Sequence, residues 1–206
     1  ANATFLANGN EFFVGREVEK MSKSKLNTVN PDDIVEKYGA DTFRMYEMFL
    51  GPVEVSKPWD TKGIEGVHRF LKKLWRLFYT DAGFAVVDEQ PTDAEYKVLH
   101  KTIKKIEEDT ERFSFNTCVS AFMVCVNELT DLKCRKKAIL EPLLILLTPY
   151  APHIAEELYQ QLRRSPSLGE GVGGWAASIL DAAFPKWQEK YLVEKAKEYP
   201  VSVNGK

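Results

Sequence analysis

The densest group of side chains that could bind an anion lies in residues 20–25. It consists of Lys20, Met21, Ser22, Lys23, Ser24 and Lys25. Lysines on a loop can neutralise the charge that develops on a reacting phosphate, and serine hydroxyls and backbone N–H groups can donate hydrogen bonds to phosphate oxygens. Because Lys and Ser are also common on any protein surface, a simple solvated loop is the alternative interpretation. The surrounding sequence decides between a phosphate-binding loop and a solvated loop.

The composition indicates a globular chain with no overall preference for nucleic acid. Of its 206 residues, 44% are hydrophobic, and 28 basic residues against 30 acidic ones give a net charge of −2. Any nucleic-acid binding must therefore come from local basic patches. The most apolar run, residues 138–151, is well short of the roughly 20 residues that a bilayer span needs. The chain also opens without a signal peptide, so we expect a cytoplasmic protein.

The cysteines and histidines do not suggest a metal centre or a catalytic set. The three cysteines are odd in number and form no C-x-x-C pair; they are Cys118, Cys125 and Cys134. With only three histidines to join them, the sequence predicts reduced core cysteines and no zinc site. We expect His68 and His100 on the surface, and His153, at a helix start, in a structural rather than a catalytic role.

A glycine-rich stretch, "GEGVGG" at residues 169–174, satisfies the dinucleotide-binding pattern G-x-G-x-x-G. That pattern requires a preceding strand, and "RRSPSL" does not read as one. We therefore expect residues 165–178 to form a flexible loop.

The anion-binding group is expected to lie between a hairpin and a pair of short helices. Asn8-Gly9-Asn10 is a hairpin turn between β-prone segments. Asn30 followed by Pro31 and two aspartates is typical of a helix start. We expect this helix to end at Gly39. A second helix should start near Asp41 and end at Gly51.

Helical periodicity dominates the rest of the chain. Apolar residues recur at three- and four-residue steps in three stretches, and a fourth, "KKAILEPLLILLTP", is apolar nearly all round and should lie at the centre of a bundle. Pro149 and Pro152 separate it from "HIAEELYQQLRR". The three stripes are Ile64, Val67, Leu71, Leu74 and Phe78; Tyr96, Leu99, Ile103, Ile106 and Phe113; and Phe115, Val119, Phe122, Val126 and Leu129.

These patterns predict a mainly α protein, an α-helical bundle preceded by a small α/β segment that carries the Lys/Ser loop. The expected divisions are residues 1–60, 61–195 and 196–206. The stretch "KWQEKYLVEKAKEY" should form a last helix. The closing "VSVNGK" reads as a strand and turn with nothing to pair with, so we expect it to begin a further domain.

Residues 20–24, "KMSKS", resemble the signature of class I aminoacyl-tRNA synthetases. The following "NPDDIVEKYGADTFRMY", "SKPW" and "GIEGVHRFL" are similar to leucyl-tRNA synthetases, and "LLTPYAPHIAEELY" resembles the helix of their anticodon-binding bundle. The resemblance covers residues 4–206. One residue departs from it: Leu26 stands where the family usually has glycine, which bears on how the loop folds or closes.

The resemblance implies a function and a set of site residues. The implied enzyme activates leucine with ATP, accompanied by Mg as counter-ion, and transfers it to tRNA(Leu). Lys23 is the implied contact of the ATP phosphates, with Lys20 and Lys25 as supporting charges. The implied parent enzyme is a monomer whose leucine pocket and nucleotide fold lie outside this chain, so we expect the fragment to be inactive alone. An isoleucyl, valyl or methionyl enzyme and a stand-alone helical RNA-binding module are the alternatives.

Four basic residues lie three and four apart on the polar side of the helix that starts near residue 61. They are Arg69, Lys72, Lys73 and Arg76. A solvated helix face is one interpretation, and a surface that contacts tRNA phosphates is the other. A weaker candidate surface consists of Lys133, Arg135, Lys136 and Lys137. Since the resemblance implies that the anticodon is not read, we expect backbone contacts without base specificity.

Overall fold

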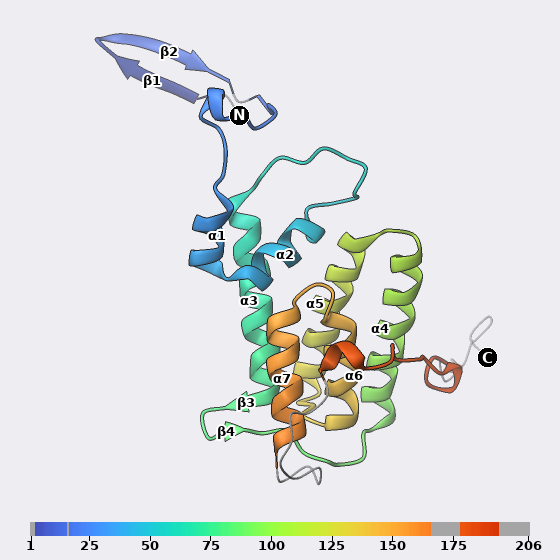
Figure 1. Ribbon diagram of the computed structural model, residues 1–206. Helices are drawn as coiled ribbons and strands as arrows, with labels where there is room; N and C mark the ends of the chain where they lie inside the picture. Colours follow the sequence, from blue (N-terminus) through green and yellow to red (C-terminus); the bar gives the residue numbers. More distant parts are fainter. Residues whose placement is uncertain (1–2, 16, 166–177, 194–206) are drawn as a thin grey trace, which may run out of the picture.

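The computed structural model describes residues 3–15, 17–165 and 178–193, and Figure 1 shows it to be mainly helical. The predicted fold class is therefore confirmed. Five long helices form the bundle, and two short ones precede it, after a hairpin that projects away from the helices (Figure 1).

The N-terminal hairpin pairs β1 (Ala3–Ala7) with β2 (Asn10–Val14) in antiparallel register, with Ala7 opposite Asn10. The turn residues Asn8 and Gly9 have φ of 52° and 78°. Two successive positive φ values define the turn that matches the natural twist of a hairpin, and Asn-Gly is its preferred sequence. The predicted turn is thus present.

The two short helices are α1 (Pro31–Tyr38) and α2 (Ala40–Phe49). The Asn30 side chain accepts a hydrogen bond from the backbone N of Asp32, and Pro31 occupies the first turn, as predicted. Gly39, with φ of 88°, ends α1 and lets α2 start at once in a new direction. Helix α2 packs against α3, α5 and α7.

The bundle contains α3 (Thr61–Phe78), α4 (Asp93–Glu111), α5 (Phe115–Asp131), α6 (Lys137–Leu147) and α7 (Pro152–Arg164). A minimal hairpin of β3 (Tyr79–Thr80) and β4 (Gly83–Phe84) follows α3. The predicted stripe of α3 is buried along its whole length. Helix α6 is buried on most of its circumference, as its apolar sequence predicted, and it keeps Pro142 inside the helix.

Three predictions are wrong in the described part of the chain. Phe113 does not extend the apolar face of α4: the helix ends at Glu111, and Phe113 is exposed with φ of 57° where the chain reverses. His100 is buried rather than on the surface. Residues 186–193 form no α-helix but only the 3-10 turn Glu189–Tyr191, which packs on α4.

The burial of His100 has a tertiary cause. Tyr191 stacks on its ring with centroids 4.5 Å apart, and the backbone N of Gln188 donates to its Nδ1 over 3.2 Å. Burial lowers the pKa of His100, so the neutral ring that can accept this bond is favoured. The "GEGVGG" and "VSVNGK" stretches lie outside the described residues.

The three cysteines are buried and free, as predicted. Burial raises the pKa of Cys125 to about 12 and that of Cys134 to about 11, which keeps both thiols protonated and unreactive at neutral pH. Within the described residues, no helix combines the length and the apolar character that crossing a membrane would take.

Candidate phosphate-binding loop and RNA-facing surface

The Lys/Ser group forms an exposed loop between β2 and α1. Its centre is the 3-10 turn Lys23–Lys25, which Ser22 caps by accepting a hydrogen bond from the backbone N of Lys25 over 3.3 Å. The hydroxyls of Ser22 and Ser24 lie 3.1 Å apart. The loop is therefore folded by its own hydrogen bonds.

Asn27 closes this loop. The backbone N of Ser22 donates to its Oδ1 over 2.8 Å, and its Nδ2 donates to the carbonyl of Lys20 over 3.4 Å. Sequence reasoning did not include Asn27 among the site residues. The signal that could have found it is an amide, able to donate and accept at once, placed just after the signature.

Leu26 ends the turn in the left-handed region, with φ of 54° and ψ of 28°, and its side chain is 91% exposed. This conformation is strained for a leucine and unstrained for a glycine. The structure therefore shows why the departure at this position matters: the backbone adopts the shape that glycine favours, although the side chain there is leucine.

The lysines of the loop differ in their pairing. Lys25 Nζ lies 2.8 Å from Glu19 Oε2, in an exposed ion pair. Lys20 and Lys23 are exposed, and neither forms an ion pair with another described residue. Two cations of this loop are thus available to an anion, and the third is partly neutralised.

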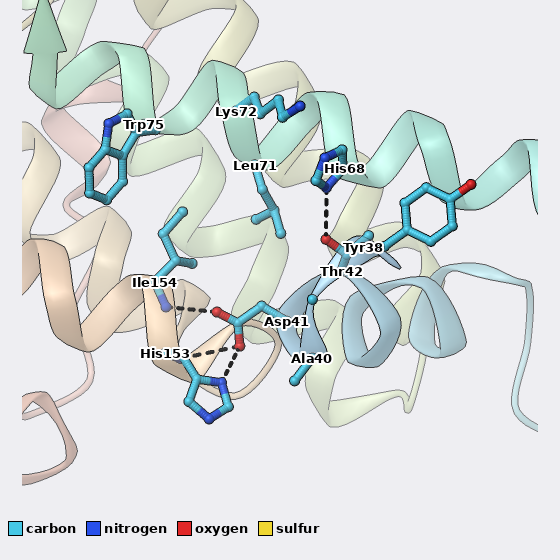
Figure 2. Close-up of a pocket in the computed structure, with 11 residues that line it drawn as sticks. Tyr38, Ala40, Asp41, Thr42, His68, Leu71, Lys72, Trp75, His153 and Ile154 are labelled. Carbon is cyan, nitrogen blue, oxygen red and sulfur yellow. Dashed lines mark hydrogen bonds and ion pairs between the residues drawn. The ribbon is translucent and has the colours of Figure 1, made fainter. Parts of the chain in front are cut away.

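Helix α2, which follows the loop and α1, is tied to α7 by a buried carboxylate. Asp41 accepts hydrogen bonds from the backbone N of His153 over 3.2 Å and of Ile154 over 2.7 Å (Figure 2). His153 Nδ1 also lies 2.7 Å from its Oδ1. Ala151, the N-cap residue of α7, has no side-chain acceptor, so Asp41 fills that role from another helix. The ring of His153 is largely exposed, so its part in this junction rests mainly on its backbone N–H.

The predicted basic stripe runs along α3, but its members are not equivalent. Arg69, Lys72 and Arg76 are exposed and form no ion pair within the described ranges. Lys73 is half-buried, and its Nζ donates to Asn127 Oδ1 over 2.7 Å. Three of the four residues thus present their charge to solvent, while Lys73 links α3 to α5.

The second basic candidate is largely engaged in holding the fold together. Arg135 Nη1 donates to the carbonyls of Arg76 and Leu77 at the end of α3, both over 2.9 Å. Lys136 Nζ forms a 2.9 Å ion pair with the buried Glu95. In Figure 1 the segment between β2 and α1, which holds the loop, lies beyond α1, away from the bundle that contains α3.

Comparison with known proteins agrees with this architecture. Residues 8–56 match the family model described as tRNA synthetases class I (I, L, M and V). These residues contain the loop, α1 and α2. Residues 96–206, more than half of the chain, match the anticodon-binding domain of tRNA ligases. The chain belongs to this family of tRNA-ligase anticodon-binding domains.

Similar proteins point to one branch of the class. The chain is 62% identical to the leucine–tRNA ligase of Cytophaga hutchinsonii and 61% identical to that of Flavobacterium psychrophilum, in each case over its whole length. It spans about a fifth of these relatives, 21% and 20% respectively. The resemblance to leucyl-tRNA synthetases predicted from the sequence is confirmed.

A solved structure shares the fold as well. It is the ternary complex of the Agrobacterium radiobacter K84 agnB2 LeuRS with tRNA and LeuAMS. The match has a TM-score of 0.64 at 26% identity and covers 84% of this chain and 23% of that one.

Proposed function

We propose that this chain is the part of a leucine–tRNA ligase that supplies the phosphate-stabilising loop and a tRNA-contacting helical bundle. The observation that carries the proposal is the identity of about 60% to leucine–tRNA ligases along the whole chain, which includes the loop. The parent enzyme would activate leucine with ATP to leucyl-adenylate and then transfer the leucyl group to tRNA(Leu). We assign residues 1–60 to the loop-bearing part and 61–195 to the bundle.

The loop has the chemistry that adenylate formation requires. When the leucine carboxylate attacks the α-phosphate of ATP, negative charge develops on that phosphate and on the leaving pyrophosphate. Lys23 and Lys20 can place ammonium groups against this charge, and Mg would accompany ATP as its counter-ion. Lys25 is a weaker contributor because Glu19 already neutralises it. Ser22 and Ser24 keep the turn in the shape that presents the lysines.

The bundle would meet tRNA(Leu) through Arg69, Lys72 and Arg76 on α3, with Lys73 adding charge from a more buried position. These cations can contact phosphates, which position a nucleic acid without reading its sequence. Leucine would be bound by other parts of the ligase. We further propose that the parent is a cytoplasmic monomer, as an enzyme that charges tRNA for translation.

A substitution at Lys23 tests the role of the loop. In the full-length ligase, Lys23→Ala should lower the rate of leucine-dependent pyrophosphate exchange by about 10²- to 10³-fold, as expected for the loss of a transition-state donor. The change in leucine affinity should be smaller. Lys25→Ala is the matched control, and its effect should be clearly weaker because Lys25 is paired with Glu19. The isolated chain should show no exchange.

An exchange rate that Lys23→Ala leaves unchanged would remove the loop from the mechanism. Equal losses for the two variants would mean that total charge matters and position does not. Exchange by the isolated chain would contradict the proposed division of labour.

A further inference from the structure

A cavity of about 450 Å³ lies where α2, α3 and the start of α7 meet. Helix α3 contributes His68, Leu71, Lys72 and Trp75 to its lining. Figure 2 shows His68 and Leu71 pointing from α3 toward the start of α2. The volume falls within the range of about 300–1,000 Å³ that is typical of small-molecule sites. The cavity is shallow and wide open to solvent, and its surface is mainly apolar. An apolar recess of this kind can take the face of a flat aromatic ligand.

Trp75 supplies the large aromatic ring on the wall of the cavity. It is 37% exposed and lines the cavity. Tyr79 stacks on it with centroids 4.6 Å apart and planes 4° from parallel. The indole is therefore held in a fixed orientation on the wall of the cavity. A preoriented aromatic plane beside an opening is the feature with which proteins stack nucleobases.

The neighbouring charges identify the kind of ligand. Successive residues of an α-helix are about 100° apart, so His68, Lys72 and Trp75 share one edge of α3, and the stripe of Arg69, Lys72 and Arg76 lies directly beside it. Lys72 belongs to both surfaces, since it lines the cavity. A strand whose phosphates lie on the stripe would bring a base to the cavity. Cations next to a stacking platform are the combination that single-stranded nucleic acid requires.

We propose that this cavity receives one unpaired base of a bound RNA, stacked on Trp75, while Arg69, Lys72 and Arg76 hold the adjoining phosphates. The proposal rests on the proposed function for the identity of the RNA, which would be tRNA(Leu). Every base has an aromatic face, so stacking accepts any base and agrees with contacts that do not read the sequence. The carboxylate of Asp41 at the floor is already bonded to α7.

The test measures binding of a tRNA(Leu) transcript by the full-length protein over a series of salt concentrations. Trp75→Leu keeps an apolar wall but removes the stacking plane, and it should weaken binding by about 5- to 100-fold, as expected for one base–aromatic stack. The slope of affinity against salt should not change, because no phosphate contact is lost. Trp75→Phe should recover most of the affinity. Phe113→Leu, which removes an exposed ring from the α4–α5 turn, should bind like the parent.

The paired change Arg69→Gln with Arg76→Gln separates this proposal from the proposed function. It should weaken binding and reduce the salt slope by about 2, since two phosphate contacts are lost. In addition, chemical modification of the unpaired bases of the bound tRNA should reveal one base that is protected by the parent and reactive with Trp75→Leu. If Trp75→Leu matches the parent while the arginine variant binds weakly, the cavity proposal is wrong and the tRNA surface stands. If both variants match the parent, both proposals fail.

Discussion

Asp41 is the residue whose replacement should reveal how firmly α2 is attached to the bundle. It is 9% exposed and joins the start of α2 to the first turn of α7, 112 residues away in the sequence. The loss of an N-cap costs typically about 1 kcal/mol and up to about 2. The favourable interaction of a carboxylate with the N-terminal end of a helix adds about 0.3–1 kcal/mol. The ring of His153 is largely exposed, so its ion pair adds little.

From these terms, Asp41→Ala should lower the free energy of unfolding by about 1.3–3 kcal/mol. Asp41→Asn should recover only part of this loss, because its single amide oxygen can accept from only one of the two backbone N–H groups that Oδ1 and Oδ2 of Asp41 accept from, and the charge is lost as well. Asp32→Ala is the matched control: Asp32 also lies in the first turn of its helix, but it is exposed, and the change should stay within about 0.5 kcal/mol. Urea denaturation followed by far-UV circular dichroism measures all three. Equal losses for Asp41→Ala and Asp32→Ala would refute the interhelical cap.

Two further predictions concern Glu95 and Leu26. Burial raises the pKa of Glu95, but its hydrogen bonds with Thr92 and Lys136 outweigh burial and lower the pKa to about 2. Its contribution to stability is therefore full above pH 4.5 and is lost as the pH falls from 4.5 toward 2. Glu95→Gln can keep the capping box, so it should lower the free energy of unfolding by about 2 kcal/mol at pH 7 and by almost nothing at pH 2. Urea denaturation at each pH measures both values. A difference between the variant and the parent that persists at pH 2 would contradict the ion pair. Leu26→Gly should relieve about 1–2 kcal/mol of strain against about 0.5–1 kcal/mol of chain entropy, so the loop should become more stable by at most about 1.5 kcal/mol in this conformation. If the loop keeps this conformation when ATP binds, the full-length ligase should bind ATP as tightly as the parent in equilibrium titration. Weaker binding would mean that the loop must leave this conformation to work.

The sequence predicted best the elements whose signals are local. The Asn8-Gly9 turn, the cap at Asn30 and the apolar stripe of α3 each depend on residues a few positions apart, and all three are present in the structure. Helix α6 is apolar nearly all round, and this alone was enough to predict that it lies at the centre of the bundle. Local propensity and periodicity were sufficient wherever no distant segment intervened.

The predictions failed where a distant segment decides the environment. His100 lies among charged neighbours in the sequence, yet Gln188 and Tyr191 fold over it from 88 and more residues away. The same contacts explain why residues 186–193 are not an α-helix, since the segment crosses α4 with only a short turn. Asp41 is similar: from the sequence it reads as the start of its own helix, and only the fold shows that it caps α7.

The basic residues show why charge alone could not define the proposed RNA-facing surface. Lysines and arginines give the same signal in the sequence at residues 69–76 and 133–137. The structure separates them by their partners: Arg135 bonds the last carbonyls of α3, and Lys136 neutralises the buried Glu95. A cation that already satisfies a buried carboxylate cannot move to a phosphate without leaving that carboxylate unpaired, which is expensive in free energy. In the described part of the chain, Arg69, Lys72 and Arg76 of the α3 stripe form no such ion pair, and the stripe also lies beside a fixed indole. A solvated helix face needs no oriented aromatic ring at its edge, whereas a surface that holds a nucleic-acid strand gains from one.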